Sequence, residues 1–558
     1  MNPAHLRKLF KLDETEGIDI LMNDSMAVGT TRTTTGRLLA HCLTLQSEYI
    51  GLTPLDRRKE KGQFFTPPEV CGFMADLLPS NLPATFRLLD PGAGIGALSA
   101  AVCDRFLGVR SSRRLQIDLF ENDAAALPFL RKTLDCCSQA MRAHGHSMSY
   151  EIHAKDFILD AAASVFGSPS LFNEPSHLGD FDAVIMNPPY FKVTKSSPYA
   201  SVMEDVVHGQ PNIYAFFLAA GAQMLRPGGE LVAITPRSFC NGLYFRGFRH
   251  WFFDKMALDR IHLFESRTEA FRDVLQESVI TASHRLGKPS STVAVSTSFG
   301  LDLHTARPAI LPISTVIDDS CGHANIRIFA SAEERAISEV VESWPHRFSE
   351  LGLRISTGPV VMFRATEFLL AEPNGNNSAP LLSVFNVKPF QTEWPLIHKK
   401  HPTAFKVCRD SQRLLLPTRN YVLLRRFSAK EERRRLTASF LLASDIAQPF
   451  VALENHLNYV CHAERELTVD EAYGLTALFN SALLDRYFRT ISGNTQVNAT
   501  EIRSMKFPSL HTVAIIGRKV RQLASLDSDA VELIVLRELG INCDLSAHLL
   551  EGTLFSHI

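Results

Sequence analysis

Between about residues 56 and 290, short apolar runs typical of β-strands alternate with stretches typical of helices. The first run, Arg87–Asp90, precedes a glycine-rich turn and an alanine-rich helical segment. The same rhythm continues through four later runs, which are Ile117–Glu121, Tyr150–Ala154, Phe181–Met186 and Glu230–Ile234. Strands joined through helical crossovers pair in parallel. The pattern therefore predicts an α/β domain built on a doubly wound, mainly parallel sheet.

The rest of the chain has a different character on either side of this domain. Its length of 558 residues suggests about two to four domains. We expect a helical N-terminal arm, the α/β domain, a connector, a second domain of mixed α+β structure and a helical tail. The corresponding residues are 1–55, 56–290, 291–325, 326–512 and 513–558.

Composition limits the classes to which the chain can belong. The hydrophobic fraction of 45% is ordinary for a globular protein. The absence of a long apolar run predicts no transmembrane helix, and the N-terminus lacks the apolar core of a signal peptide, which predicts a cytoplasmic location. The ten cysteines show no metal-binding spacing, so we expect reduced thiols and no metal centre. The net charge of −1 still allows a localised basic face.

A glycine-rich loop, Asp90-Pro91-Gly92-Ala93-Gly94-Ile95-Gly96, follows the first predicted strand. Its glycines let the backbone approach a ligand closely, and their spacing differs from the G-x-G-x-x-G of dinucleotide sites. After the next strands, Glu121 could accept hydrogen bonds from ribose hydroxyls and Asp156 from an adenine amino group, with Phe157 against the purine. Each acid alone is more often a helix cap or a solvated charge. Together at successive strand ends, they favour a cofactor that contains adenosine.

Upstream of this loop, Gly62–Val70 reads Gly-Gln-Phe-Phe-Thr-Pro-Pro-Glu-Val. Pro67 is favoured in the first turn of a helix, so Thr66 could cap that helix. Alternatively, Thr66 contacts the amino-acid end of the cofactor. Both interpretations are open at this point.

The tetrapeptide Asn187-Pro188-Pro189-Tyr190 follows the predicted strand Phe181–Met186. An adenine amino group is a poor nucleophile, because its lone pair is delocalised into the ring. The Asn187 side-chain oxygen and the Pro188 carbonyl could accept its two hydrogens and expose the lone pair, while the prolines hold the turn rigid. Tyr190 offers a flat face for an extruded base. A plain Pro-Pro turn is the alternative, but after a cofactor-type loop we expect catalysis.

In this order, the motifs resemble those of the gamma-class N6-adenine DNA methyltransferases of type II restriction-modification systems, of which the TaqI methylase is an example. The resemblance covers about residues 50–510 and is strongest over 62–280. It implies a Rossmann-like S-adenosylmethionine-dependent methyltransferase sheet followed by an α+β target-recognition domain. It also implies methyl transfer from S-adenosylmethionine to N6 of a flipped adenine in double-stranded DNA.

The resemblance also implies roles for individual residues. Cofactor contacts are implied for Thr66, Asp90, Pro91, Gly92, Ala93, Gly94, Gly96, Glu121, Asp156 and Phe157. Catalytic roles are implied for Asn187, Pro188, Pro189 and Tyr190. Family members carry a second aromatic ring against the flipped base, for which Phe271 is the candidate, although an ordinary core phenylalanine is equally expected there. Many relatives have Glu-Pro where this chain has Asp90-Pro91, a shorter carboxylate.

Residues 326–512 resemble the recognition region of such enzymes, notably at Ser356–Val361 and Gly493–Thr500. DNA contacts are predicted for Lys399, Lys400, Arg425, Arg426, Asn494, Gln496 and Asn498, and for the run Arg433–Arg435. Basic side chains would contact phosphates, and amides would contact base edges or backbone. The alternative for the basic run is a solvated helix, since Lys430-Glu431-Glu432 mixes both charges.

Other substrates also fit the tetrapeptide, namely adenine in RNA and the glutamine amide of a protein. Protein glutamine methylases, however, are about half this length and lack a large C-terminal region. The cofactor motif begins near residue 62, which leaves little room for a preceding nuclease domain. We therefore predict a separate cognate restriction endonuclease that acts on the same site. We also predict a monomer, because each methyl transfer needs one subunit at a time.

Overall fold

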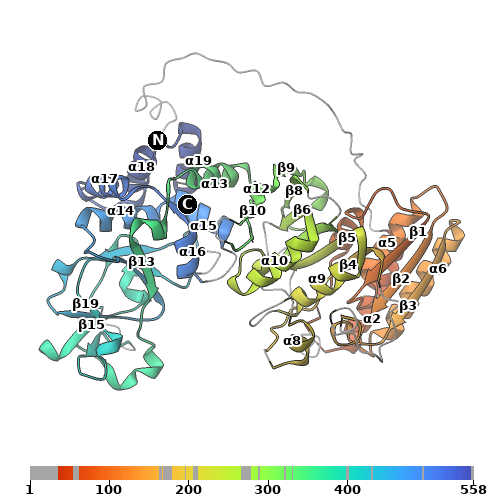
Figure 1. Ribbon diagram of the computed structural model, residues 1–558, viewed down its shortest axis with the longest axis horizontal. Helices are drawn as coiled ribbons and strands as arrows, with labels where there is room; N and C mark the ends of the chain where they lie inside the picture. The colour runs from red at the N-terminus through yellow and green to blue at the C-terminus, as the bar shows by residue number, and fades with distance from the viewer. Residues whose placement is uncertain are drawn as a thin grey trace, which may run out of the picture. The chain divides into compact units, whose positions relative to one another are not determined.

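The computed structural model describes residues 36–54, 62–63, 65–162, 166, 179–194, 196–204, 206, 212–264, 278–286, 290–319, 322–329, 331–396, 401–428, 432–492 and 496–554. The N-terminal half of these residues forms a nine-stranded sheet in the order β3-β2-β1-β4-β5-β7-β6-β8-β9 (Figure 1). Its strands are β1 (Thr85–Asp90), β2 (Arg114–Phe120), β3 (Ser147–His153), β4 (Phe181–Met186), β5 (Leu225–Pro236), β6 (Met256–Phe264), β7 (Ser278–Arg285), β8 (Thr292–Ser298) and β9 (Ala309–Pro312).

The first five strands are parallel and coincide with the five that the sequence predicts. The direction changes at β7, which is antiparallel to both β5 and β6. Residues 291–325, which we expected to connect two domains, contribute β8 and β9 to the same sheet. The predicted α/β class with a Rossmann-like sheet is confirmed.

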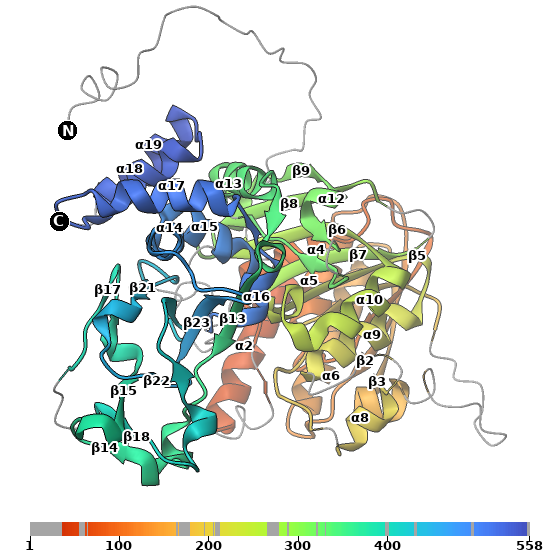
Figure 2. The ribbon, with the colours of Figure 1, turned by 60° about the vertical axis from the view of Figure 1, so that its left-hand side comes forward.

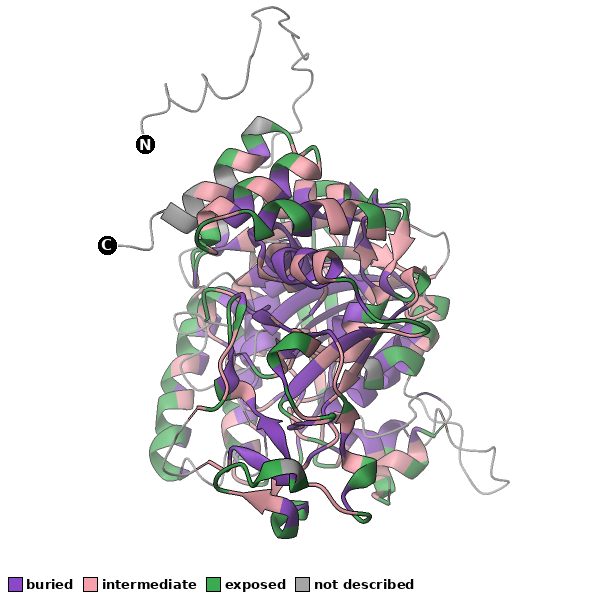
Figure 3. Cartoon of the chain, turned by 90° about the vertical axis from the view of Figure 1, so that its left-hand side faces the viewer, coloured by how far each residue is buried: buried purple, intermediate pink, exposed green. Residues whose placement is uncertain are grey.

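Helices cover both faces of this sheet. They are α2 (Arg37–Leu52), α4 (Pro68–Asp76), α5 (Ala97–Leu107), α6 (Leu127–Ala143), α8 (Pro198–Val202), α9 (Ile213–Met224), α10 (Arg246–Lys255) and α12 (Ile313–Val316). In β4, Ala183 and Ile185 join the core beneath α2, α4, α5 and α6, whereas Val184 and Met186 join the core beneath α9 and α10. A strand buried on both faces needs no polar alternation, which explains why β4 is apolar apart from Asp182; buried residues fill the interior of the molecule in Figure 3. Asp182 accepts from Arg226 Nε at 2.6 Å.

Within the N-terminal arm that we expected to be helical, the structure describes α2, and α5 anchors its first turn. The backbone N–H groups of Leu38 and Leu39 donate to the Asp104 carboxylate of α5 at 3.0 and 2.9 Å. These bonds satisfy amides that have no partner within their own helix. The N-terminal helix is therefore fixed to the sheet domain.

The C-terminal half combines small sheets with a helical layer (Figure 2). One four-stranded sheet has the order β13-β23-β20-β21, and a five-stranded sheet has the order β14-β18-β15-β22-β19. The strands are β10 (Ile317–Asp318), β11 (Asn325–Ile326), β12 (His346–Arg347), β13 (Leu353–Thr357), β14 (Leu369–Leu370), β15 (Ser378–Leu382), β16 (Val387–Lys388), β17 (Gln391–Thr392), β18 (Ala404–Lys406), β19 (Leu416–Pro417), β20 (Tyr421–Arg425), β21 (Ala438–Leu441), β22 (Phe450–Leu453), β23 (Leu457–His462) and β24 (Lys506–Phe507).

The helices of this half pack against one face of the four-stranded sheet and share a core with it. They are α13 (Ala332–Glu342), α14 (Val469–Asn480), α15 (Ala482–Ile491), α16 (Ala499–Ser504), α17 (Leu510–Arg521), α18 (Ser528–Glu538) and α19 (Cys543–Leu554). Among the residues that the structure describes, no helix has the length and apolarity needed to cross a membrane.

Candidate active site

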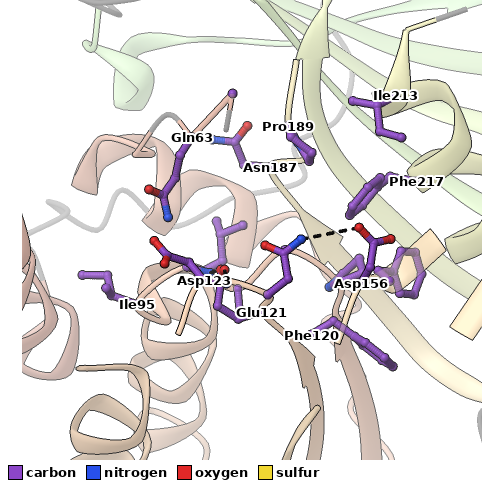
Figure 4. A pocket seen from close by; sticks show the side chains of 18 of the residues that line it. Gln63, Ile95, Phe120, Glu121, Asp123, Asp156, Asn187, Pro189, Ile213 and Phe217 are labelled. Carbon is purple, nitrogen blue, oxygen red and sulfur yellow. Dashed lines mark hydrogen bonds between the residues drawn. The ribbon is translucent and has the colours of Figure 1, made fainter. Parts of the chain in front are cut away.

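A cavity of about 450 Å³ opens at the carboxyl ends of β1 to β4 (Figure 4). This edge is where open α/β sheets bind ligands, and the volume suits a small organic molecule. The predicted residues that line it are Thr66, Pro91, Gly92, Ala93, Gly94, Glu121, Asp156, Phe157, Asn187 and Pro189. Asp90, Gly96, Pro188 and Tyr190 lie outside its lining, and Phe271 lies outside the described residues.

The glycine-rich loop adopts a backbone that its glycines make possible. Gly94 and Gly96 have φ angles of +57° and +90°, which other L-residues rarely adopt. A Cβ atom on Gly96 would also lie 3.0 Å from a side-chain carbon of Leu130. At Gly92, an added Cβ would lie 3.7 Å from the main-chain oxygen of Asn187. The loop therefore brings the cofactor motif into contact with the tetrapeptide.

Asp90 lies behind this loop and does not face the cavity. Its side chain is buried and accepts a hydrogen bond from the Ser99 hydroxyl at 2.7 Å. Burial raises the pKa of Asp90 from 3.8 to about 7. Asp90 thus lies outside the cavity lining and bonds the first turn of α5, and its contact with the cofactor stays a prediction.

Glu121 and Asp123 follow β2 and form the next wall of the cavity. Glu121 accepts from the backbone N–H groups of Gly94 at 2.8 Å and of Asp123 at 2.7 Å. The Tyr49 hydroxyl of α2 donates to Asp123 at 2.7 Å and lies 3.0 Å from the Gln63 side-chain oxygen. A carboxylate has room for further hydrogen bonds, so Glu121 can still accept from a ligand. The N-terminal helix thus supports this wall from outside the cavity, through Tyr49.

Asp156 and three aromatic rings form the opposite wall. The Asp156 Oδ1 atom accepts two backbone N–H groups, whereas Oδ2 accepts from the Tyr199 hydroxyl at 2.7 Å and from Asn122 at 3.4 Å (Figure 4). The rings of Phe120, Phe157 and Phe217 lie beside it, and the ring centre of Phe157 is 5.2 Å from the ring centre of each of the other two. An aromatic, apolar wall with a carboxylate beside it suits a purine that carries an amino group.

Two hydroxyl groups hold the Asn187 carboxamide, one at each end. Its Nδ2 donates to Thr66 Oγ1 at 3.0 Å, so this hydroxyl does not cap α4, whose N-cap residue is Pro67. The Tyr190 hydroxyl lies 2.7 Å from Asn187 Oδ1 and 3.1 Å from the Ile234 carbonyl, and it can donate to either. Burial raises the pKa of Tyr190, so its hydroxyl stays protonated. These contacts fix the side chain of Asn187 at the cavity wall.

The predicted DNA-contacting residues that the structure describes lie at the end of β20 and just before α16. Arg425 donates to the Val387 carbonyl at 2.8 Å, and Arg426 lies 3.3 Å from the Gln496 side-chain oxygen. Asn498 precedes α16 and bonds Glu501 there. Lys399, Lys400 and Asn494 lie outside the described residues.

For the basic run Arg433–Arg435, the structure contradicts the predicted DNA contact at one position, Arg435. Arg435 is 1% exposed, and its guanidinium donates to the Ser492 carbonyl at 3.2 Å. It lies over the ring of Phe488. The prediction that Arg435 contacts phosphate is therefore wrong, because its side chain is buried and its guanidinium is hydrogen-bonded inside the protein.

Sequence reasoning missed several residues of the cavity. Asn122 and Asp123 directly follow Glu121, so extending the motif by two polar positions would have found them. Tyr199 and Phe217 carried no such signal, because they come from helices whose position depends on the whole fold. Tyr49, which holds Asp123, likewise carried no signal, because it precedes all the motifs that the sequence shows.

Comparison with known proteins shows the family to which this chain belongs. The Eco57I restriction-modification methylase family model matches residues 114–271. The type II methyltransferase M.BsuBI of Bacillus subtilis is 35% identical over 508 residues, which are 89% of this chain and 98% of that protein. This chain belongs to the type II restriction-modification methyltransferases. Type II methyltransferase M.PstI of Providencia stuartii is 32% identical over 468 residues, covering 83% of this chain and 90% of that protein.

A solved structure is similar at lower identity. The type IIL restriction-modification enzyme MmeI in complex with DNA has a TM-score of 0.47 and 10% identity, over 84% of this chain and 72% of that chain.

As a type II methyltransferase, the enzyme methylates DNA, and S-adenosylmethionine is its cofactor. The cavity fits this cofactor in size, in its aromatic side chains and in its three carboxylates, Glu121, Asp123 and Asp156.

Proposed function

We propose that this type II methyltransferase transfers a methyl group to N6 of an adenine that is flipped out of duplex DNA. The observation that carries the proposal is the held carboxamide of Asn187 beside the cofactor cavity. Family membership favours DNA over RNA or a protein amide as the substrate.

The proposed chemistry requires two acceptors for the hydrogens of the adenine amino group. Asn187 Oδ1 is one, and the carbonyl of Pro188, rigid between two rings, is the other. Accepting both hydrogens pulls the nitrogen towards a tetrahedral geometry and exposes its lone pair. The bound cofactor supplies the electrophilic methyl group. The methylated nitrogen is acidic enough to lose its proton to water, so no strong base is needed.

The residues proposed to hold the cofactor follow from the two cavity walls. Glu121 would accept from the ribose hydroxyls, and Asp156 from the adenine amino group. Phe157 would pack against the purine, with Thr66 and the glycine-rich loop towards the methionine end.

One experiment tests the reaction. The enzyme is incubated with labelled S-adenosylmethionine and plasmid DNA, and N6-methyladenine is mapped by sequencing. Asn187→Ala should lower the rate on the order of 10²-fold or more, as removal of one preorganised hydrogen-bonding group does elsewhere. Asn374→Ala, at an exposed loop position, is the matched control. Label only in RNA or protein, or methylation only at cytosine, would refute the proposal.

The proposal extends to the biological partner and the assembly state. A separate cognate restriction endonuclease would cut the same sequence, and the methylase would protect that sequence as a monomer. Protection of methylated plasmid from digestion tests the first statement. Light scattering of the enzyme with and without duplex DNA tests the second.

A further inference from the structure

Three loops gather at one end of the sheet β13-β23-β20-β21 (Figure 2). The antiparallel register sets Thr357, near the end of β13, and Leu424, near the end of β20, opposite Asn458 at the start of β23. The loops that continue from these strands therefore emerge side by side. Loops carried on a paired sheet hold their side chains more firmly than free loops do.

Asn458 joins these loops to the segment that follows α15. Its side chain is fully buried, lies 3.0 Å from the Thr357 hydroxyl and donates to the Val497 carbonyl at 2.7 Å. The N–H of Val497 donates in turn to the carbonyl of Arg426 at 2.7 Å. Two segments that sequence analysis singled out separately are thus tied to one strand end.

Gly358 allows the first loop to approach the second. Its N–H donates to the Leu457 carbonyl at 2.8 Å, and an added Cβ would lie 2.2 Å from the main-chain oxygen of Glu454. No larger residue fits this approach without moving backbone. The close spacing of the two loops therefore requires glycine at position 358.

Four partly exposed side chains lie together on this platform, and we call them the recognition surface: Arg426, Phe427, His456 and Gln496. Phe427 is 41% exposed, and its ring centre lies 5.0 Å from that of His456 and 5.7 Å from the Arg426 guanidinium. Arg426 also bonds the Asn455 carbonyl at 3.1 Å. Because its guanidinium bonds Asn455 and Gln496, Arg426 is suited to holding the neighbouring side chains in position.

A buried carboxylate lies behind His456. Glu454 is 2% exposed, and its Oε1 lies 2.5 Å from His456 Nδ1. Its other oxygen has no hydrogen-bond partner among the described residues. Two acceptors this close would repel each other, so Nδ1 carries a hydrogen and Nε2 is the atom left for a ligand. Glu454 thereby orients the imidazole so that its Nε2 atom is the one that a ligand can reach.

We infer that the recognition surface contacts base edges in duplex DNA, with His456 and Gln496 as the hydrogen-bonding groups and Phe427 as the apolar contact. An amide and an oriented imidazole match the donor and acceptor pattern of base edges, and an exposed ring packs against a thymine methyl or a base face. Arg426 and Glu454 are positioning residues. The inference rests on the proposed function, because it assumes that the substrate is duplex DNA.

The test measures binding to two duplexes by fluorescence anisotropy across a salt series. One duplex carries the sequence that the unmutated enzyme methylates, and the other lacks it. His456→Ala and Phe427→Ala should each weaken binding to the first duplex by about 5- to 100-fold. Binding to the second should change less than about twofold, because base contacts add little to non-specific affinity. The pair Phe385 and His401, another exposed phenylalanine against a histidine, supplies matched alanine controls.

The salt series separates base contacts from phosphate contacts. The slope of log affinity against log salt should be unchanged in His456→Ala, because no phosphate contact is lost. Equal weakening on both duplexes with the slope reduced by about one would overturn the inference. So would affinities within about twofold of the parent, since a base contact is worth more than that. Glu454→Gln, which can still accept from Nδ1, should retain affinity that Glu454→Ala loses.

Failure of the inference is distinguishable from failure of the proposed function. If the unmutated enzyme methylates its sequence but His456→Ala, Phe427→Ala and Glu454→Ala bind like the controls, only the inference is overturned. If the unmutated enzyme neither binds nor methylates DNA, both are overturned. Melting temperatures within a few degrees of the parent exclude unfolding as the cause, and His456→Gln provides a second, milder variant.

Discussion

Replacing Thr66 with valine tests how the catalytic carboxamide is held. The substitution keeps the branched shape and removes the hydroxyl that accepts from Asn187 Nδ2 at 3.0 Å. Thr66 is 6% exposed, so water has little access to replace the lost acceptor. The contact of Tyr190 at the other end of the carboxamide remains. Asn187 then keeps one of its two anchors.

The magnitude follows from the net value of a hydrogen bond. A neutral bond contributes about 1 kcal/mol, and leaving a buried partner unsatisfied costs about 1–3 kcal/mol. Because Asn187 itself is only half-buried, we expect a loss of about 1–2 kcal/mol. If that loss falls on the transition state, the turnover number decreases about 5- to 30-fold.

Steady-state methylation of a short duplex with tritiated S-adenosylmethionine measures the effect. We expect kcat to fall in Thr66→Val, and KM for the cofactor, which Thr66 is also proposed to contact, to rise by a smaller factor than kcat falls. The double variant with Tyr190→Phe should depart from additivity, because both changes act on one side chain. An unchanged kcat with a raised KM for the cofactor would refute this reasoning and show that Thr66 serves the cofactor alone.

Three further perturbations probe the recognition surface, the adenine wall and the cofactor loop. Gly358→Ala puts a methyl group 2.2 Å from a main-chain oxygen and should destabilise the fold by about 3 kcal/mol in urea unfolding, whereas Gly72→Ala, with open space around it, should not. Tyr199→Phe removes a donor that a cofactor amino group would replace at Asp156, so calorimetry should show about fivefold tighter cofactor binding; weaker binding would contradict this. The raised pKa of Asp90, about 7 against 3.8, means that its ionisation destabilises the folded state fully above pH 7 and progressively less as the pH falls to 3.8. Asp90→Asn should therefore stabilise the protein by about 2 kcal/mol more at pH 8 than at pH 5.5, and equal effects would argue against a buried charge.

Much of the fold was accessible from the sequence because strand signals are local. The run Phe181–Met186 is apolar at every position except Asp182, and it forms a strand buried on both faces. The reversal at β7 was not accessible, since strand direction within a sheet depends on how a connection folds back. The strands β8 and β9 were missed because they lie among the prolines and polar residues of 288–325, and β9, at the edge of the sheet, is only four residues long.

The candidate site was accessible only where its residues are close in sequence. Glu121, Asp156 and Asn187 each follow a strand, so the edge of a parallel sheet gathers them. The bond between Thr66 and Asn187 joins residues 121 positions apart, and no local pattern encodes it. Tyr199 is a similar case, because its hydroxyl reaches Asp156 from a separate helix.

Tyr49 has a consequence for anyone who wishes to divide this enzyme into parts. The family model matches residues 114–271, yet Tyr49 of α2 lies against Gln63 and Asp123 at the cofactor cavity. A fragment that begins at residue 56 would keep every strand and the whole glycine-rich loop and still lack the tyrosine that holds Gln63 and Asp123 of the cavity wall. A chimaera that joins this sheet to a foreign recognition region has to carry residues 37–52 as well. Without them, we expect the chimaera to lose affinity for S-adenosylmethionine before any question of DNA sequence arises.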